Sequence, residues 1–241
     1  MDPQVLIFEN AQAAAEACGD RTFELLIEAR RQRGVATLAL SGGNTPRLMF
    51  QSMVKRGFDW SRVKFFQVDE RCVPPDDAQS NSRMIRESFL LPAGIDESQF
   101  CRIRTELPPD EAARTYAEDI RRIMNPQPGE LPAFDIIQRG MGPDAHTASL
   151  FPGEPLIADR TGIASAVWME KFHQHRVTLL PGVLERGRCT LCLATGPEKV
   201  EALRLVLRGP RDPMKAPSQI ASPEMVWYVD QSAAALIRSG G

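Results

Sequence analysis

Short apolar runs recur along the chain and predict buried β-strands. The clearest one lies at residues 35–40 (VATLAL), where apolar side chains are nearly continuous instead of alternating with polar ones. Continuous runs of this length are typical of parallel strands that are covered on both faces. Comparable runs, bounded by Gly, Pro and polar residues, predict further strands at residues 5–8, 63–68, 134–138, 164–169, 176–180, 189–195 and 225–229.

Segments with helical composition and helix-end signals separate most of these strands. Residues 11–33 are rich in Ala, Glu and Arg and stop at Gly34, and Thr45 followed by Pro46 fits the cap and first turn of a helix that runs to about residue 56. Strands that alternate with helices predict an α/β fold, in which a mostly parallel sheet carries helices on both faces. Further helices are expected at residues 80–91, 109–124 and 232–237, and another follows residues 195–199 and runs to about residue 207. A turn or short helix is expected at residues 181–187.

Length and composition narrow the class of protein. The chain has 241 residues, the usual size of one α/β domain, so we expect a single domain over residues 1–241. Apolar residues make up 43% of it, which is enough for a full core. The net charge of −2 gives no general attraction to nucleic acid or to a membrane surface. No apolar run approaches 18 residues and the N-terminus has no signal-peptide pattern, so we expect a cytoplasmic protein.

The cysteines and two of the histidines predict neither disulfides nor a metal site. The five cysteines are an odd, scattered set, which is typical of reduced thiols. Cys189 and Cys192 form a C-x-x-C inside a predicted strand, where residues three apart point to opposite faces. We interpret His173 and His175 as loop residues, because no Cys or carboxylate pair lies near them to complete a zinc site. We therefore expect no metal.

The most informative stretch is residues 133–153, AFDIIQRGMGPDAHTASLFPG. A predicted strand leads into a glycine-rich turn with His146, and ligands of open α/β sheets bind at the carboxyl ends of strands. Thr147 is expected to cap a short helical turn after it. One alternative is a tight turn with an ordinary surface histidine. Another is a dinucleotide site, since residues 140–145 fit G-x-G-x-x-A, although the following helix is too short and no acidic residue is well placed about 20 residues on.

A second glycine turn, at residues 41–45, has the features of an anion site. Gly42 and Gly43 expose backbone N–H groups after a buried strand, and the N-terminus of the following helix favours negative charge. The turn is not a Walker loop, because no Gly-Lys-Ser/Thr follows. The alternative is a plain strand–helix turn.

Two more loops with charged residues follow predicted strands. Residues 69–71 (Asp-Glu-Arg) follow one strand, and Lys199 follows another in the first turn of a helix, where it opposes the helix dipole unless an anion is bound. Arg71 can bind phosphate through two N–H groups, and Asp69 can hold Arg71 or a sugar hydroxyl. Solvated surface charges are the alternative. In a parallel sheet these loops share one edge with His146, which puts a phosphate-binding site beside a candidate general base. No Ser or Cys nucleophile is evident in the sequence, so we expect water to be the nucleophile.

These segments resemble the 6-phosphogluconolactonases, within the wider group that includes the glucosamine-6-phosphate deaminases. The resemblance covers nearly the whole chain in order, and its most specific piece is GMGPDAHTASLFPG. It implies a Rossmann-like α/β fold, no cofactor, and hydrolysis of 6-phospho-glucono-δ-lactone in the oxidative pentose phosphate pathway. The matching pieces are LSGGNTP (40–46), VDER (68–71) with SNSRM (80–84), GMGPDAHTASLFPG (140–153), RVTL (176–179), LATGPEK (193–199) and WYVD (227–230).

The resemblance also implies roles for single residues and for partners. His146 would activate water, and Asp69 and Asp144 would position the sugar or the imidazole. The expected partner is a small sugar-phosphate lactone, with no nucleic acid or membrane, in a monomer or small homo-oligomer. The residues that would bind substrate or phosphate are Ser41, Gly42, Gly43, Thr45, Arg71 and Lys199.

Some positions depart from the family pattern. Ala145 stands where the family usually has Gly, and Gln138 and Arg139 stand where it usually has apolar residues. If position 145 requires a positive φ, alanine there is strained. The deaminases have segments like Asp-Glu-Tyr and Asn-Gly-His-Ile-Ala-Phe, where this chain has Asp-Glu-Arg at 69–71 and Asp-Ala-His-Thr-Ala-Ser at 144–149, so the lactonase function is favoured. A deaminase and a non-catalytic sugar-phosphate binder remain the alternatives.

Overall fold

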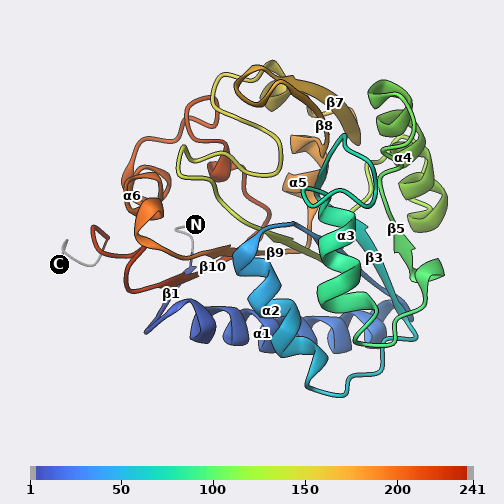
Figure 1. Cartoon of the computed structure of the whole chain (residues 1–241), viewed down its shortest axis with the longest axis horizontal. Helices are drawn as coiled ribbons and strands as arrows, with labels where there is room; N and C mark the ends of the chain where they lie inside the picture. The colour runs from blue at the N-terminus through green and yellow to red at the C-terminus, as the bar shows by residue number, and fades with distance from the viewer. Residues whose placement is uncertain (1–3, 238–241) are drawn as a thin grey trace.

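A seven-stranded, entirely parallel sheet runs through the middle of the molecule (Figure 1), in a computed structural model that describes residues 4–237. The predicted strands are present, with bounds that differ from the prediction by at most two residues, and one further edge strand was not predicted. In the order in which they neighbour one another, the strands are β1 (Gln4–Phe8), β10 (Glu224–Asp230), β9 (Cys189–Ala194), β6 (Ile136–Arg139), β2 (Ala36–Leu40), β3 (Val63–Gln67) and the unpredicted β5 (Phe100–Cys101).

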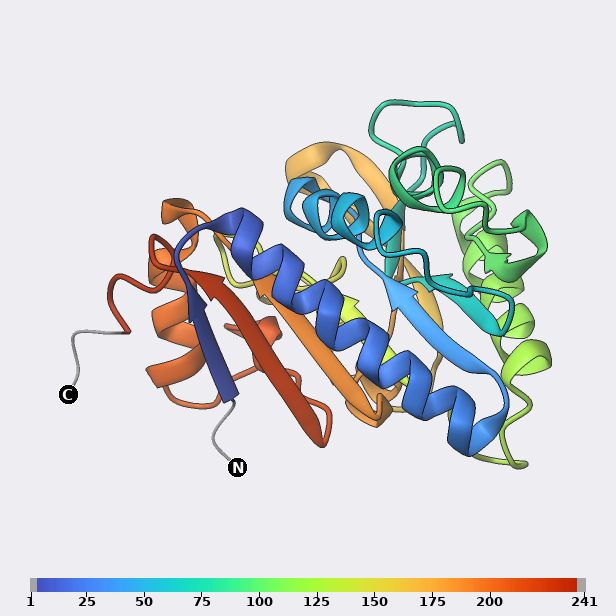
Figure 2. The same ribbon diagram turned by 90° about the horizontal axis from the view of Figure 1, so that it is seen from below.

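Helices cover both faces of this sheet, as predicted. Successive strand side chains point to opposite faces, so Leu38 and Leu40 pack with the first two helices while Ala39 packs on the other side. Figure 2 shows the long first helix lying across one face. That face carries α1 (Ala11–Arg33) and α2 (Asn44–Val54), and the other carries α4 (Pro109–Met124), α5 (Pro181–Arg186) and α6 (Val200–Arg208).

A second, smaller sheet was not predicted as a separate unit. It contains β4 (Asp69–Arg71), β8 (Gln174–Leu179) and β7 (Ala164–Met169), all antiparallel. The prediction that residues 69–71 form a loop is therefore wrong, because their backbone pairs with β8. The prediction of a loop at His175 is wrong as well, since this residue lies within β8 with its ring 4.8 Å from that of Trp168.

Two of the predicted helices match the structure residue for residue, at 11–33 and 109–124, whereas two others are not single α-helices. The predicted helix at 80–91 is divided into α3 (Asn81–Ile85) and a π-helical segment, η1 (Arg86–Leu90). The predicted helix at 232–237 is a series of turns instead. The Asp230 carboxylate accepts hydrogen bonds from the Ala233 N–H and the Ser232 hydroxyl, as at a helix N-cap, but no regular helix follows up to residue 237.

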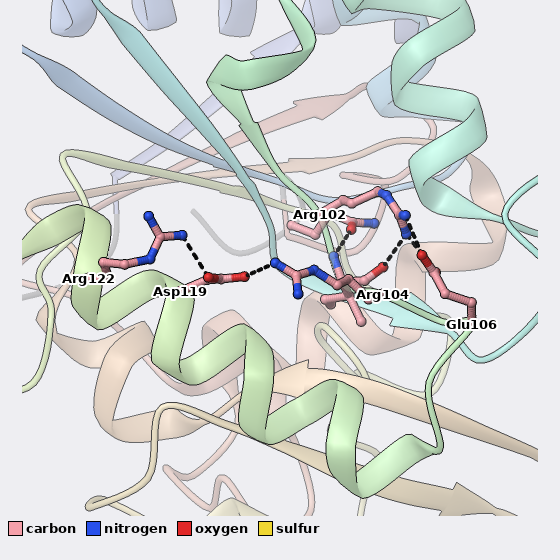
Figure 3. A network of polar contacts seen from close by, with 7 residues as sticks. Arg102, Arg104, Glu106, Asp119 and Arg122 are labelled. Carbon is pink, nitrogen blue, oxygen red and sulfur yellow. Dashed lines mark hydrogen bonds and ion pairs between the residues drawn. The ribbon is translucent and has the colours of Figure 1, made fainter.

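The connection after the edge strand β5 is tied to α4 by charged side chains (Figure 3). The Asp119 carboxylate bridges Arg104, at 2.8 Å, and Arg122, at 2.7 Å. Arg102 pairs with Glu106 a few residues along the same connection. None of the helices in the described part of the chain is both long and apolar enough to cross a bilayer.

The sheet reverses its winding direction between β2 and β6. From β2 the chain adds β3 and β5 on one side, and from β6 it adds β9 and β10 on the other. Only two residue pairs join the two central strands. Side chains complete this seam at both ends, because Asp135 binds the Thr37 backbone and hydroxyl at 2.8 and 2.9 Å and Gln138 accepts from the Ser41 N–H at 3.2 Å. Ligands of open α/β sheets bind at such a reversal.

We predict that Tyr116→Phe destabilises the fold. The Tyr116 hydroxyl, buried on α4, accepts from the Gln67 N–H at 2.8 Å and donates to the Gln67 carbonyl at 2.6 Å, at the end of β3. Its removal takes a partner from two buried backbone groups and should lower the free energy of unfolding by about 1–3 kcal/mol in urea titrations. Tyr228→Phe is the control, because the Tyr228 hydroxyl makes no hydrogen bond within residues 4–237; equal losses in both variants would contradict this account.

Candidate active site

The four segments selected from the sequence meet at one cavity of about 270 Å³. They follow β9, β6, β2 and β3, four consecutive neighbours in the sheet, so their carboxyl ends lie side by side at the winding reversal. Asp144 is the one predicted site residue that does not line the cavity, and it lies behind His146 instead. The predicted residues that do line it are Ser41, Gly42, Gly43, Thr45, Asp69, Arg71, His146 and Lys199.

The first loop needs glycine at two positions. Gly43 has φ of 118° and is the N-cap of α2. A Cβ on Gly42 would lie 1.9 Å from Oδ1 of Asn81, so only a bare backbone lets that amide approach. The predicted cap at Thr45 is wrong, because the helix begins at Asn44, two residues before the predicted start. The Thr45 hydroxyl instead lies 3.0 Å from that of Thr195, between two loops that line the cavity.

Asn81 is held by a buried carboxylate on the neighbouring segment. Both oxygens of Glu70, which is fully buried, accept hydrogen bonds, and burial raises the pKa of the Glu70 carboxyl while these donors oppose that rise. The network links the end of β3, β4 and the start of α3, and so fixes Asn81 beside Gly42. The donors are the N–H groups of Arg71 (2.8 Å), Asn81 (2.8 Å) and Ser82 (2.6 Å), the Gln67 amide (2.8 Å) and the Ser80 hydroxyl (3.3 Å).

The His146 imidazole makes close contacts with two residues of its own loop. Its Nδ1 lies 2.5 Å from Oδ1 of Asp144, and a Cβ on Gly142 would lie 1.9 Å from the same nitrogen. Burial raises the pKa of Asp144, but the hydrogen bond and charge of the His146 ring outweigh burial and hold that pKa at about 2. An ionised carboxylate only accepts hydrogen bonds, so Nδ1 carries the proton. Within residues 4–237 nothing hydrogen bonds to Nε2, which leaves it as the basic nitrogen.

The turn after Gly142 has a left-handed backbone at Ala145, the conformation in which the sequence analysis expected alanine to be strained. Ala145 has φ of 65° and Ala148 has φ of 52°. Left-handed backbone costs a non-glycine residue roughly 1–2 kcal/mol. The buried Ala145 methyl packs in a core cluster with Met141 and Trp227, and such burial returns about 0.8 kcal/mol. The predicted helix cap at Thr147 is wrong: no helical turn follows, and its hydroxyl donates to the Gly140 carbonyl at 3.0 Å, which closes the loop.

Asp69 faces the cavity without pairing with Arg71. Its Oδ2 accepts from the Ser149 hydroxyl at 2.7 Å, and the described residues contain no ion pair between Asp69 and Arg71. Oδ1 makes no hydrogen bond within residues 4–237. The alternative in which Asp69 holds Arg71 is therefore wrong, and one carboxylate oxygen is left for a ligand.

A second arginine, Arg176, was missed in the sequence. It lies directly opposite Arg71 in the β4–β8 pair, and both side chains line the cavity. The Nε atoms of both are buried without a hydrogen-bond partner. Burial lowers the pKa of Arg176, Asp69 opposes this effect, and the charge of Arg71 adds to it. Like charges that face each other across a pair of strands repel, so an anion between them would be stabilising.

The remaining cation comes from the loop after β9. Lys199 ends a 3₁₀ turn, η5 (Pro197–Lys199), immediately before α6. The prediction that Lys199 lies in the first turn of the α-helix is therefore wrong, because α6 begins at the next residue. Its amino group lies 3.8 Å from the Glu198 carboxylate, which is mostly exposed.

Among residues 4–237 no group of three or more His, Cys, Asp or Glu is arranged to hold a metal ion.

The two unusual polar residues of β6 link segments of the fold. The buried Gln138 binds the Ser41 backbone, as described for the seam. Arg139 is 1% exposed and donates from Nη2 to the Ile220 carbonyl, which anchors the connection between α6 and β10. Neither side chain lines the cavity.

We predict that Glu70→Gln is strongly destabilising. A glutamine amide keeps one acceptor oxygen, but it replaces the other with an NH2 group. That NH2 group is a donor and would face N–H groups that need an acceptor. Because hydrogen bonds to a charged group contribute about 1.5–3 kcal/mol each, we expect a loss of at least about 2 kcal/mol in the free energy of unfolding, measured by chemical denaturation. The control is Glu87→Gln, whose exposed i,i+4 pair with Arg83 should contribute no more than about 0.5 kcal/mol. A Glu70→Gln variant as stable as this control would contradict the role of the network.

Comparison with known sequences places the chain in a family. The family model described as glucosamine-6-phosphate isomerases/6-phosphogluconolactonase matches residues 9–228. A 6-phosphogluconolactonase of Synechocystis sp. is 32% identical over 241 residues, covering 99% of this chain and 100% of the relative. One of Treponema pallidum is 37% identical over 85% of this chain and 84% of the relative.

Solved structures agree with the sequences. The crystal structure of devB protein has a TM-score of 0.87 at 30% identity, covering 97% of this chain and 99% of that one. A 6-phosphogluconolactonase from Thermotoga maritima has a TM-score of 0.83 at 25% identity, covering 95% and 100%. A monomeric glucosamine-6-phosphate deaminase, at 16% identity and a TM-score of 0.83, shares the fold. The expected resemblance and the Rossmann-like fold are thus confirmed, and the chain belongs to the glucosamine-6-phosphate isomerase/6-phosphogluconolactonase family.

Proposed function

We propose that this protein hydrolyses 6-phospho-D-glucono-1,5-lactone to 6-phosphogluconate. The observation that carries the proposal is the pairing, in one cavity, of an Asp-oriented histidine with three cationic side chains. The relatives described above bear the name of that activity. This lactone has a phosphate that the cationic side chains can bind and, several bonds away, an ester carbonyl that lies within reach of the histidine.

The phosphate is the group that the cations bind. Arg71 and Arg176 face each other across β4 and β8, and Lys199 approaches from the loop after β9. Gly42 and Gly43 add backbone N–H groups at the start of α2, where a helix favours an anion, and the hydroxyls of Ser41 and Thr45 line the same wall. Binding energy from phosphate, which takes no part in bond breaking, holds the lactone carbonyl in place for attack.

His146 is the general base. Its Nε2 takes a proton from a water molecule as the water oxygen attacks C1 of the lactone. The tetrahedral intermediate then breaks the bond between C1 and the ring oxygen, and the imidazolium returns the proton to that oxygen. The new carboxylic acid releases its own proton to solvent, so the histidine ends as it began. The Asp144 carboxylate stabilises the transient imidazolium, and general acid–base help of this kind gives roughly 10²–10⁴-fold.

Asp69 positions the sugar. Asp69 lines the cavity and Ser149 holds its Oδ2, while Oδ1 has no hydrogen-bond partner among residues 4–237, so the carboxylate is oriented before any ligand arrives. A fixed acceptor of this kind suits a sugar hydroxyl, which donates one hydrogen bond.

The first test is a lactonase assay with the wild type and His146→Ala. After subtraction of spontaneous lactone hydrolysis, we expect His146→Ala to lower kcat by at least about 100-fold with a Tm close to that of the wild type. A chelator should leave the wild-type rate unchanged. Ammonia release from glucosamine 6-phosphate would replace the lactonase proposal with a deaminase, and a phosphate-induced rise in Tm without turnover of either substrate would indicate a binding protein.

The second test separates the anion grip from the chemistry. Arg176→Met keeps the length and packing of the buried side chain but removes its charge. Loss of a charged hydrogen bond to phosphate should raise KM by about 10–100-fold and change kcat by no more than about threefold. Arg160→Met, at an exposed arginine paired with Glu185, is the control and should leave both parameters unchanged. An unaltered KM for Arg176→Met would rule out the grip as described.

A further inference from the structure

We propose that Phe151 is a positioning residue for the general base. Its ring stacks on the His146 imidazole with a centroid distance of 4.0 Å and an interplanar angle of 19°. Phe151 is only 8% exposed, so this contact is formed away from bulk water. The inference rests on the proposed role of His146 and adds a residue that touches the base but not the described cavity.

The hydrogen bond to Asp144 alone does not fix the imidazole. A ring held at Nδ1 can still tilt about the line between that nitrogen and Oδ1, and the tilt swings Nε2 through an arc. The backbone of Gly142 limits movement at one edge of the ring, because it leaves no room even for a Cβ there. The Phe151 face limits the tilt itself. Together these three contacts determine where Nε2 points.

Phe151 is in turn supported by the second sheet. It packs in a small apolar cluster with Val167 and Met169 of β7. The Phe172 ring, which is 45% exposed, meets only its edge, at 5.9 Å, and is not part of this cluster. The Arg176 guanidinium lies 5.7 Å from the centroid of Phe151. Val167 and Met169 therefore hold the Phe151 ring, and they belong to the same small sheet that carries the two facing arginines.

The stacking also has a chemical consequence. An aromatic face attracts a cation more than a neutral ring, by about 0.5–2 kcal/mol. The imidazole gains positive charge only as it takes the proton from water, so the attraction is stronger in the transition state than in the ground state. Interactions of that kind raise kcat and leave substrate binding nearly unchanged.

The test is Phe151→Leu in the lactonase assay. Leucine keeps an apolar side chain of similar bulk but offers no flat face. We expect kcat to fall by about 5–30-fold, because both the attraction described above and the restraint on the ring are lost. KM should stay within about twofold of the wild-type value. Phe151→Tyr, which restores an aromatic face, should return kcat to within about threefold of the wild type.

Phe172→Leu is the matched control. Phe172 belongs to the same aromatic group and lies over the same Arg176 guanidinium, at 4.9 Å, but it has no ring contact with His146 and is 45% exposed. It should leave kcat unchanged. If Phe151→Leu fails to fold, as judged by circular dichroism, Phe151→Met is measured in its place against the same criteria.

Two results would overturn the inference, and they are distinguishable. If His146→Ala is inactive but the Phe151 variant keeps the wild-type kcat, or loses it equally with Phe172→Leu, then Phe151 has no positioning role and the proposed function stands. If His146→Ala is fully active, the base itself is misassigned, and the role of Phe151 fails with it.

Discussion

The arrangement of this site depends on one buried carboxylate. Glu70 lies where the large sheet gives way to the small one, and its two oxygens collect donors from β3, β4 and the start of α3. Through the Arg71 backbone it sets the first strand of the small sheet, and through Asn81 it sets the wall against Gly42. A carboxylate is suited to this task because it accepts several hydrogen bonds at once and donates none. The burial that raises its pKa is the energetic cost of joining three segments at a single point.

The cavity is organised before a ligand arrives, and its organisation is unfavourable without one. Arg71 and Arg176 are opposed in register, with buried Nε atoms that have no partner, and Ala145 holds a left-handed backbone. Strain and unbalanced charge of this kind collect at functional sites because the rest of the fold holds them in place. An anion that enters meets groups already desolvated and aimed, so little reorganisation is needed on binding.

Much of this could be predicted from the sequence, and the failures have a common cause. The segments after four strands met as expected, because the carboxyl ends of parallel strands share an edge. The concern about Ala145 was correct, because its φ is positive. Arg176 was missed because its place beside Arg71 comes from antiparallel pairing between segments over a hundred residues apart, and local patterns do not encode such a register. The final helix was wrong even though Asp230 caps the Ala233 N–H as at a helix start, because a cap alone does not make so short a segment continue as a helix.

The seam between β2 and β6 also sets the spacing of the site. One side of it carries the glycine turn and Arg71, and the other carries His146 and the turn before Lys199, yet only two residue pairs join the two strands. The cations that bind the anion therefore come from both halves of the sheet, while the base belongs to one half. The buried side chains that complete the seam, Asp135 and Gln138, thus also hold the two parts of the site at one distance from each other.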